Sequence, residues 1–148
     1  MTVVRMERAH LPAVAELERE CFADAWSEKA LELLLTEDAI GAVCLDGGRV
    51  TAYGGMLWAP DEGQITNIAV AFDTRRRGCG RAVLEFLITV AKERDCAQIA
   101  LEVRASNKAA IALYEKYGFF VAGQRRRFYK APVEDALVMI LTLGNGKG

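Results

Sequence analysis

An arginine- and glycine-rich stretch has the residue types that most directly suggest ligand binding. Residues 75–82 read RRRGCGRA, with four arginines and two glycines in eight residues. Glycines between a strand and a helix let a ligand approach the backbone closely, and the first turn of a helix leaves amide donors unpaired. Those donors and the helix dipole would favour a pyrophosphate. The alternative is a solvated basic loop in front of a helix.

Two nucleotide-binding motifs are excluded by the residues around these glycines. The dinucleotide fingerprint G-x-G-x-x-G needs a third glycine where Val83 stands, and the P-loop needs G-K-[ST], which does not occur. The formal net charge of −1 also lacks the broad positive excess of nucleic-acid-binding domains. We therefore expect no direct nucleic-acid function, and a different phosphorylated ligand.

A glutamate within an apolar segment is a candidate proton acceptor. Glu102 interrupts IALEV, which is expected to be a strand in the middle of a sheet, where a carboxylate would be partly desolvated. A carboxylate within reach of an amine can take its proton. The alternative is a glutamate at a strand end that pairs with Arg104 or another base.

A tyrosine on the following helix is a candidate proton donor. Tyr114 lies seven residues after Asn107, so both share one helix face about two turns apart. The alternative is a core tyrosine whose hydroxyl is hydrogen-bonded. Spacing alone does not separate Tyr114 from Tyr117.

Histidine and cysteine usage predicts no metal centre and no export. The chain has one histidine, His10, and four scattered cysteines without a C-x-x-C pair. No apolar run approaches the roughly 18 residues of a membrane span, and the N-terminus is charged where a signal peptide would be apolar. We expect a cytoplasmic protein with no membrane partner.

The elements that must position these residues follow from hydrophobic periodicity and turn signals. DGGR at 46–49 predicts a hairpin turn, and strand–helix–strand around residues 63–103 predicts parallel neighbours. The length fits one domain, 1–143, with a frayed tail at 144–148. The expected fold is α/β (α+β), a mixed sheet of about seven strands flanked by about four helices in the order β-α-α-β-β-β-α-β-α-β-β. Helices are expected at 11–22, 27–35, 80–95 and 107–118, and strands at 2–6, 39–45, 50–58, 63–72, 97–103, 119–128 and 135–143.

The arginine-glycine loop, the helix after it and LEVRASNKAAIALYEKYGF at 101–119 closely resemble the Gcn5-related N-acetyltransferase (GNAT) superfamily. Within it, WSEKA, NIAV and VEDALVM are similar to the RimI-type enzymes, which acetylate the N-terminal alanine of ribosomal protein S18. The resemblance covers nearly the whole chain. It implies a GNAT fold, acetyl-CoA as cosubstrate, and the N-terminus of a protein, from the ribosome, as acceptor.

The resemblance also implies roles for individual residues. Glu102 matches the general base, Tyr114 the general acid that protonates the departing thiolate, and Asn107 a cofactor-contacting asparagine. A strand that pairs with the pantetheine arm and a loop around the pyrophosphate supply the other cofactor-binding positions. These are Ile68, Ala69 and Val70 in the strand, and Arg76, Arg77, Gly78, Cys79, Gly80 and Arg81 in the loop.

Two consequences for the reaction follow from this placement. Cys79 would lie at the phosphates, so we expect direct transfer without a covalent intermediate. A backbone amide near Ala69 or Val70 could hold the carbonyl oxygen if the strand is bulged or splayed from its parallel neighbour.

The side that receives the acceptor is where the chain departs from the RimI-type pattern. Ala25 replaces a proline before the tryptophan, and Phe128 replaces a tyrosine. Arg125–Arg127 could contact RNA or form a solvated strand end. Alternative functions are acetylation of a small amine or a lysine, and a non-catalytic acyl-CoA-binding module. Candidates for acceptor preference are Asp24, Trp26, Glu62, Tyr129, Glu134 and Asp135.

Overall fold

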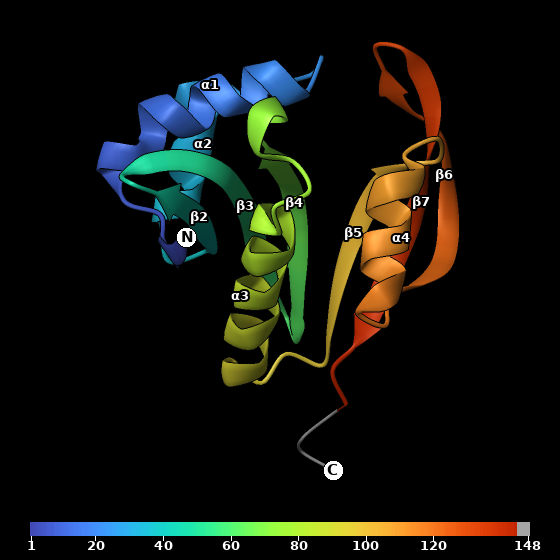
Figure 1. Ribbon diagram of the computed structural model, residues 1–148. Coiled ribbons are helices and arrows are strands. Elements are labelled where there is room, and N and C mark those ends of the chain that lie inside the picture. The colour runs from blue at the N-terminus through green and yellow to red at the C-terminus, as the bar shows by residue number, and fades with distance from the viewer. Residues whose placement is uncertain (145–148) are drawn as a thin grey trace.

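A seven-stranded mixed sheet, with strand order β1-β2-β3-β4-β5-β7-β6, forms the centre of the computed structural model, which describes residues 1–144 (Figure 1). The β4–β5 pair is parallel and the other neighbours are antiparallel, as the strand–helix–strand pattern predicts. Of the tail expected at 144–148, all but Gly144 lies outside the described residues. The strands are β1 Thr2–Arg5, β2 Ala39–Asp46, β3 Arg49–Ala59, β4 Glu62–Val70, β5 Gln98–Arg104, β6 Phe120–Lys130 and β7 Val133–Thr142.

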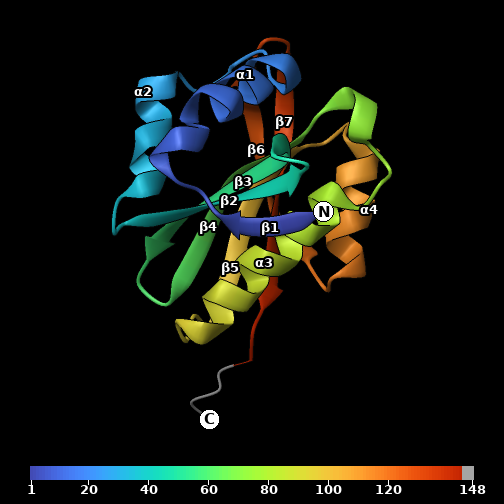
Figure 2. The same cartoon turned by 60° about the vertical axis from the view of Figure 1, so that its left-hand side comes forward.

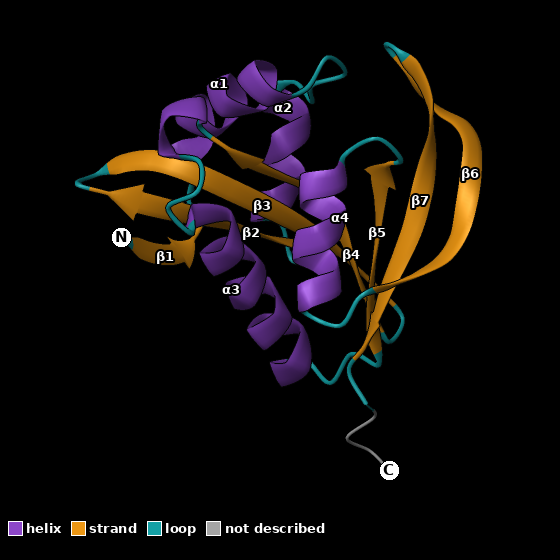
Figure 3. Ribbon diagram, turned by 45° about the vertical axis from the view of Figure 1, so that its right-hand side comes forward, coloured by secondary structure: helices purple, strands orange, loops and turns teal. Residues whose placement is uncertain are grey.

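Helices cover both faces of the sheet and give the molecule two cores (Figures 2 and 3). On β2, Ala42 and Cys44 belong to the core under α3 and α4, whereas Val43 belongs to the core under α1 and α2. This is the alternation expected when successive strand side chains point to opposite faces. The helices are α1 Leu11–Cys21, α2 Glu28–Leu31, α3 Cys79–Glu93 and α4 Lys108–Lys116, with 3-10 turns at Arg8–His10, Glu32–Leu35 and Phe72–Thr74.

Several predicted boundaries are confirmed by the local geometry. Gly47 and Gly48 have positive φ values of 60° and 86° in the β2–β3 turn, as a primed hairpin turn requires. Asn107 caps α4 by accepting a hydrogen bond from the Ala110 amide at 3.2 Å, and Gly118 follows the helix with φ 98°. The segment Asn107–Gly118 is therefore the predicted capped helix.

Two expected elements give way to 3-10 turns before their predicted ends. The helix expected over 27–35 starts at the Ser27 cap, but it tightens to a 3-10 turn after Leu31. A 3-10 turn places residues three apart in line, which lets Leu31 and Leu34 both face the sheet. The strand expected to reach Phe72 ends at Val70, and the chain then makes its own 3-10 turn.

Among residues 1–144, no helix is long and apolar enough to cross a bilayer.

Candidate active site

The central strands part in the middle of the molecule, and a cavity lies where they do. β4 and β5 pair only from Glu62–Ile65 to Gln98–Leu101; beyond this point they diverge, as Figure 1 shows. The cavity of about 750 Å³ is lined by both diverging strands, by α4, by the loop between α1 and α2, and by the β6–β7 turn. In open α/β sheets, ligands bind in the crevice beyond the carboxyl ends of parallel strands, and the cavity lies at that position here.

A bulge in β4 marks the place where the strands separate. Gly54 pairs with Ile68 while Met56 pairs with Ile65, so Gly55 faces both Thr66 and Asn67. A side chain at Gly55 would begin 2.6 Å from Oγ1 of Thr66, which explains the glycine. The bulge takes the β4 backbone out of regular pairing beside the cavity, and β4 then runs unpaired with β5 past Ala69 and Val70. An amide there that holds the carbonyl oxygen stays a prediction.

The cavity has two sides, and β5 sends different residues to each. Leu101 and Val103 pack in the core under α3 and α4, so Glu102 and Arg104 lie on the opposite face. Tyr114 comes from α4 on the first side. The gap between the strands joins the two sides, and Glu102 and Tyr114 both line it.

The geometry favours Tyr114 over Tyr117 as the phenol that serves the cavity. Tyr114 is 8% exposed, packs on the Phe119 ring at 5.5 Å between centroids, and lines the cavity. Burial raises its pKa to about 12, with a smaller contribution from Tyr129, so the phenol keeps its proton at neutral pH. Tyr117 instead donates a hydrogen bond to Glu85 of α3.

Glu102 is half-buried and is held by a base other than Arg104. Its side chain is 32% exposed, and Nε of Arg125 on β6 donates to Oε2 at 3.0 Å. Within the described residues, Oε1 receives no hydrogen bond, so it can accept from a ligand. Arg104 instead binds the β6–β7 turn, donating to the carbonyls of Ala131 and Pro132 at 3.2 and 3.0 Å.

The arginine-glycine loop leads into α3 and brings the backbone of the helix N-terminus to the surface. Gly78 is the N-cap residue with φ 85°, and no side chain among residues 1–144 caps the helix. The first-turn amides at Cys79, Gly80 and Arg81 therefore have no intrahelical acceptor, and they are the donors that a pyrophosphate would use. A side chain at Gly80 would begin 3.0 Å from Cγ2 of Val70. The exposed Arg76 and Arg77 flank this cradle.

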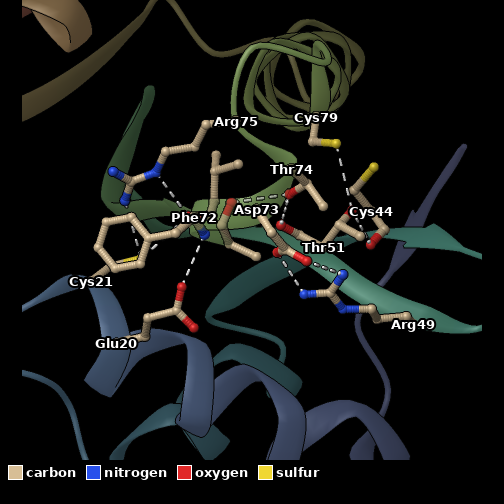
Figure 4. Close-up of polar contacts among 12 residues, drawn as sticks. Glu20, Cys21, Cys44, Arg49, Thr51, Phe72, Asp73, Thr74, Arg75 and Cys79 are labelled. Atoms are coloured by element: carbon tan, nitrogen blue, oxygen red, sulfur yellow. Dashed lines mark hydrogen bonds and ion pairs between the residues drawn. The ribbon is translucent and has the colours of Figure 1, made fainter.

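Two of the loop's own side chains, those of Arg75 and Cys79, hold it against the strands behind it, and both are labelled in Figure 4. Nε of Arg75 donates to the Val70 carbonyl at 3.2 Å, and its guanidinium lies 4.0 Å above the Phe72 ring. The Cys79 thiol points inward, where the Thr51 hydroxyl donates to it at 3.6 Å (Figure 4). Cys79 can therefore serve a ligand only through its backbone.

The three residues of the expected pantetheine strand differ in what they offer. All three pair with β3 on one edge, and no described residue of β5 pairs with them on the other. Ile68 lines the cavity, Ala69 is buried in the core under α1, and the Val70 carbonyl also accepts from the Cys21 thiol at 3.4 Å. The edge beside Ile68 is thus the part of β4 open to a ligand.

Comparison with known proteins decides the family. Residues 11–119 match the model of the acetyltransferase (GNAT) family. The chain belongs to the GNAT acetyltransferases. Enzymes of this family use acetyl-CoA, and the cavity, the capless helix N-terminus and the open edge of β4 fit that cosubstrate.

Relatives cover nearly the full length of this GNAT chain. The [ribosomal protein bS18]-alanine N-acetyltransferase of Escherichia coli K12 is 40% identical over 144 residues, which are 96% of this chain and 97% of that protein. The N-alpha-acetyltransferase RimI of Mycobacterium tuberculosis is 33% identical over 94% of this chain and 90% of its own length. The crystal structure of the E. coli S18-alanine N-acetyltransferase superposes with a TM-score of 0.90 at 39% identity, covering 97% and 94% of the two chains. The GNAT fold and RimI-type similarity predicted from the sequence are confirmed.

The residues expected to set acceptor preference in this GNAT protein are only partly brought together. Asp24, Trp26 and Tyr129 line the cavity. Glu62 does not, because it accepts from Gln98 at the closed end of the strand pair. The other two anchor neighbouring backbone: Glu134 accepts from the Ser106 amide at 2.7 Å, and Asp135 from the Arg127 amide at 2.8 Å.

Sequence reasoning missed one polar group at this site. Glu18 on α1 is fully buried, and its carboxylate accepts a hydrogen bond from Asn67 of the β4 bulge at 2.9 Å. The sequence carries no local signal of this contact, since Glu18 stands beside apolar residues at helical spacing and Asn67 is 49 positions away.

Proposed function

We propose that this GNAT protein transfers the acetyl group of acetyl-CoA to the α-amine of an N-terminal alanine, that of ribosomal protein S18. The observation that carries the proposal is the gap between β4 and β5, with Glu102 on one side and Tyr114 on the other. An amine that enters from the side of Glu102 reaches a thioester held in that gap. The named activity of the E. coli relative supplies the acceptor. The cytoplasmic location expected from the sequence is part of the same proposal.

Glu102 has the position for the first proton transfer in this proposal. An α-amine has a pKa of about 7.7–8.0, so at neutral pH most of it carries a proton that must leave before attack. Oε1 of Glu102 takes that proton, directly or through one water, while Arg125 holds Oε2. The neutral nitrogen then bonds to the thioester carbonyl carbon.

Tyr114 and the β4 bulge have positions for the second half of the reaction. When the carbon–sulfur bond breaks, the sulfur leaves as a thiolate and needs a proton. The buried Tyr114 phenol, which is protonated, donates its proton to that sulfur, and it is reprotonated by the second proton that the attacking nitrogen loses as it becomes the amide. Backbone amides near the bulge donate to the carbonyl oxygen, where negative charge develops.

Mass spectrometry of peptides incubated with acetyl-CoA tests the acceptor. The peptides begin with Ala, Ser or Met and contain one internal lysine, and each has a control whose α-amine is already acetylated. We expect acetyl on the α-amine of the Ala peptide first and none on the controls. Acetylation of the lysine in the blocked peptides, with free α-amines untouched, would show a lysine acetyltransferase instead.

A further inference from the structure

Glu18 is a buried carboxylate that none of the steps above uses. It has no exposed surface, and three donors from three different segments converge on it. The Trp26 amide donates to Oε2 at 3.0 Å, Nδ2 of Asn67 donates to the same oxygen at 2.9 Å, and the Tyr53 hydroxyl donates to Oε1.

Each donor belongs to an element at the cavity or directly behind it. Trp26 is the last residue of the loop 22–26. This loop, which includes Asp24, forms the cavity wall on the side that Glu102 faces. Asn67 lies in the β4 bulge, where the strands part. Tyr53 is 1% exposed on β3, directly opposite Ala69 of β4. A single carboxylate therefore ties the acceptor-side wall to the strand that is expected to hold the thioester.

The packing of α1 against the sheet does not require a charged side chain at position 18. α1 already buries Leu11, Val14 and Leu17 against the sheet. A buried carboxylate costs several kcal/mol of desolvation, and replacing buried ionic groups by apolar ones is often neutral or stabilising. The advantage of Glu18 is directional, because a carboxylate can accept from an amide, a carboxamide and a phenol at fixed angles, whereas a leucine cannot.

We propose that Glu18 is a positioning residue for the acceptor: its carboxylate fixes the 22–26 loop relative to the β4 bulge, and so fixes where the acceptor amine meets the thioester. The identity of that acceptor rests on the function proposed above, but the tie between loop and bulge does not. Glu18 touches neither substrate and acts through Trp26 and Asn67.

Steady-state kinetics with Glu18→Gln tests the proposal. A glutamine amide has one acceptor oxygen and brings an NH2 group against donors that previously shared a carboxylate. We expect the KM for an N-terminal Ala peptide to rise at least tenfold, while the KM for acetyl-CoA changes less than twofold. Glu16→Gln is the matched control, since it removes the same charge from the exposed side of the same helix. Its two KM values should equal those of the wild type.

A spectroscopic measurement follows the loop independently of turnover. The chain has two tryptophans, so Trp58→Phe leaves Trp26 as the only one. In that background we expect Glu18→Gln to increase acrylamide quenching of Trp26 by about twofold, and Glu16→Gln to leave it unchanged. If no peptide is acetylated even by the wild type, the proposed function fails, and quenching still tests the tie.

Tyr53→Phe supplies a milder variant in case Glu18→Gln does not fold. It removes one donor and keeps the carboxylate with its two N–H partners, so the peptide KM should rise two- to threefold. The proposal is overturned if folded variants keep the wild-type peptide KM and Trp26 quenching. It is equally overturned if both KM values rise together, because that result indicates general loosening of the structure.

Discussion

At the scale of single residues, the two groups that we propose to transfer protons lie on opposite sides of the sheet. Glu102 faces the side of the α1–α2 loop and remains partly exposed, so protons can pass from it to water. Tyr114 lies in the core under α4, where burial raises the pKa of the phenol to about 12. A partly exposed base and a buried acid therefore carry the two proposed proton transfers in different environments.

Removal of either group should slow turnover without preventing acetyl-CoA binding. Glu102→Gln and Tyr114→Phe each lose one proton-transfer group, and we expect kcat to fall about 10²- to 10⁴-fold. Tyr117→Phe is the control, because its hydroxyl binds Glu85 outside the cavity and should be dispensable for turnover. Stopped-flow or coupled thiol assays give kcat, and calorimetry gives the affinity for coenzyme A. Wild-type turnover by both variants would refute these roles.

The raised pKa of Tyr114 also predicts how stability depends on pH. A free tyrosine titrates near pH 10, whereas the folded protein holds the proton to about pH 12. The folded state therefore binds more protons than the unfolded state in this window, so the stabilising contribution is complete below pH 10 and is lost as the pH rises toward 12. Urea unfolding between pH 9 and 11.5 should show a steeper fall for the wild type than for Tyr114→Phe. Parallel curves would contradict this assignment.

Residues with local partners could be predicted from the sequence, and those with distant partners could not. The Asn107 cap binds an amide three positions away, so its type and spacing were sufficient. The Glu102–Arg125 pair joins residues 23 apart through β6, and reasoning from the strand alone could name only Arg104 or an unspecified other base. Glu18 and Tyr53 are 35 apart. Only the tertiary fold decides such contacts.

At the scale of elements, the site depends on where regular structure stops. The β4 bulge interrupts a strand beside the cavity, and the early end of β4 at Val70 and the left-handed Gly78 before α3 bound the arginine-glycine loop. Hydrophobic periodicity predicts the elements well but not their ends, since a bulge does not change which residues are apolar. The glycines at these interruptions were the available signals, and the one at Gly55 was not recognised.

The arginine-glycine loop should bind through its backbone more than through its side chains. Gly80→Val would crowd Val70 and cover the first-turn amides of α3, so we expect the affinity for coenzyme A to fall at least tenfold. Arg76→Ala removes only an exposed charge, and such charges contribute little in water, so a change of threefold or less is expected. Isothermal titration calorimetry compares the two. A larger loss from Arg76→Ala would assign binding to the side chains.

At the scale of the whole molecule, the sheet consists of two halves joined by a short parallel contact. β1–β4 with their helices form one half, and β5–β7 with α4 form the other (Figure 1). The β4–β5 ladder joins them over four residue pairs, and the core under α3 and α4 continues across the junction. A cosubstrate lying in the gap would contact both halves and strengthen their connection.

Coenzyme A should therefore stabilise the protein and protect a defined set of amides. At a concentration of 100 times its Kd, a ligand adds about 2.7 kcal/mol, which for a domain of this size raises the Tm by about 5–10 °C. In hydrogen exchange, we expect new protection within residues 66–70 and 76–82, because the first segment borders the gap and the second contains the arginine-glycine loop. Residues 122–127 of the outer strand β6 serve as the internal control and should exchange at the same rate. Protection confined to β6, or a thermal shift without protection at 66–70, would place the ligand elsewhere and remove the basis for the two-sided site.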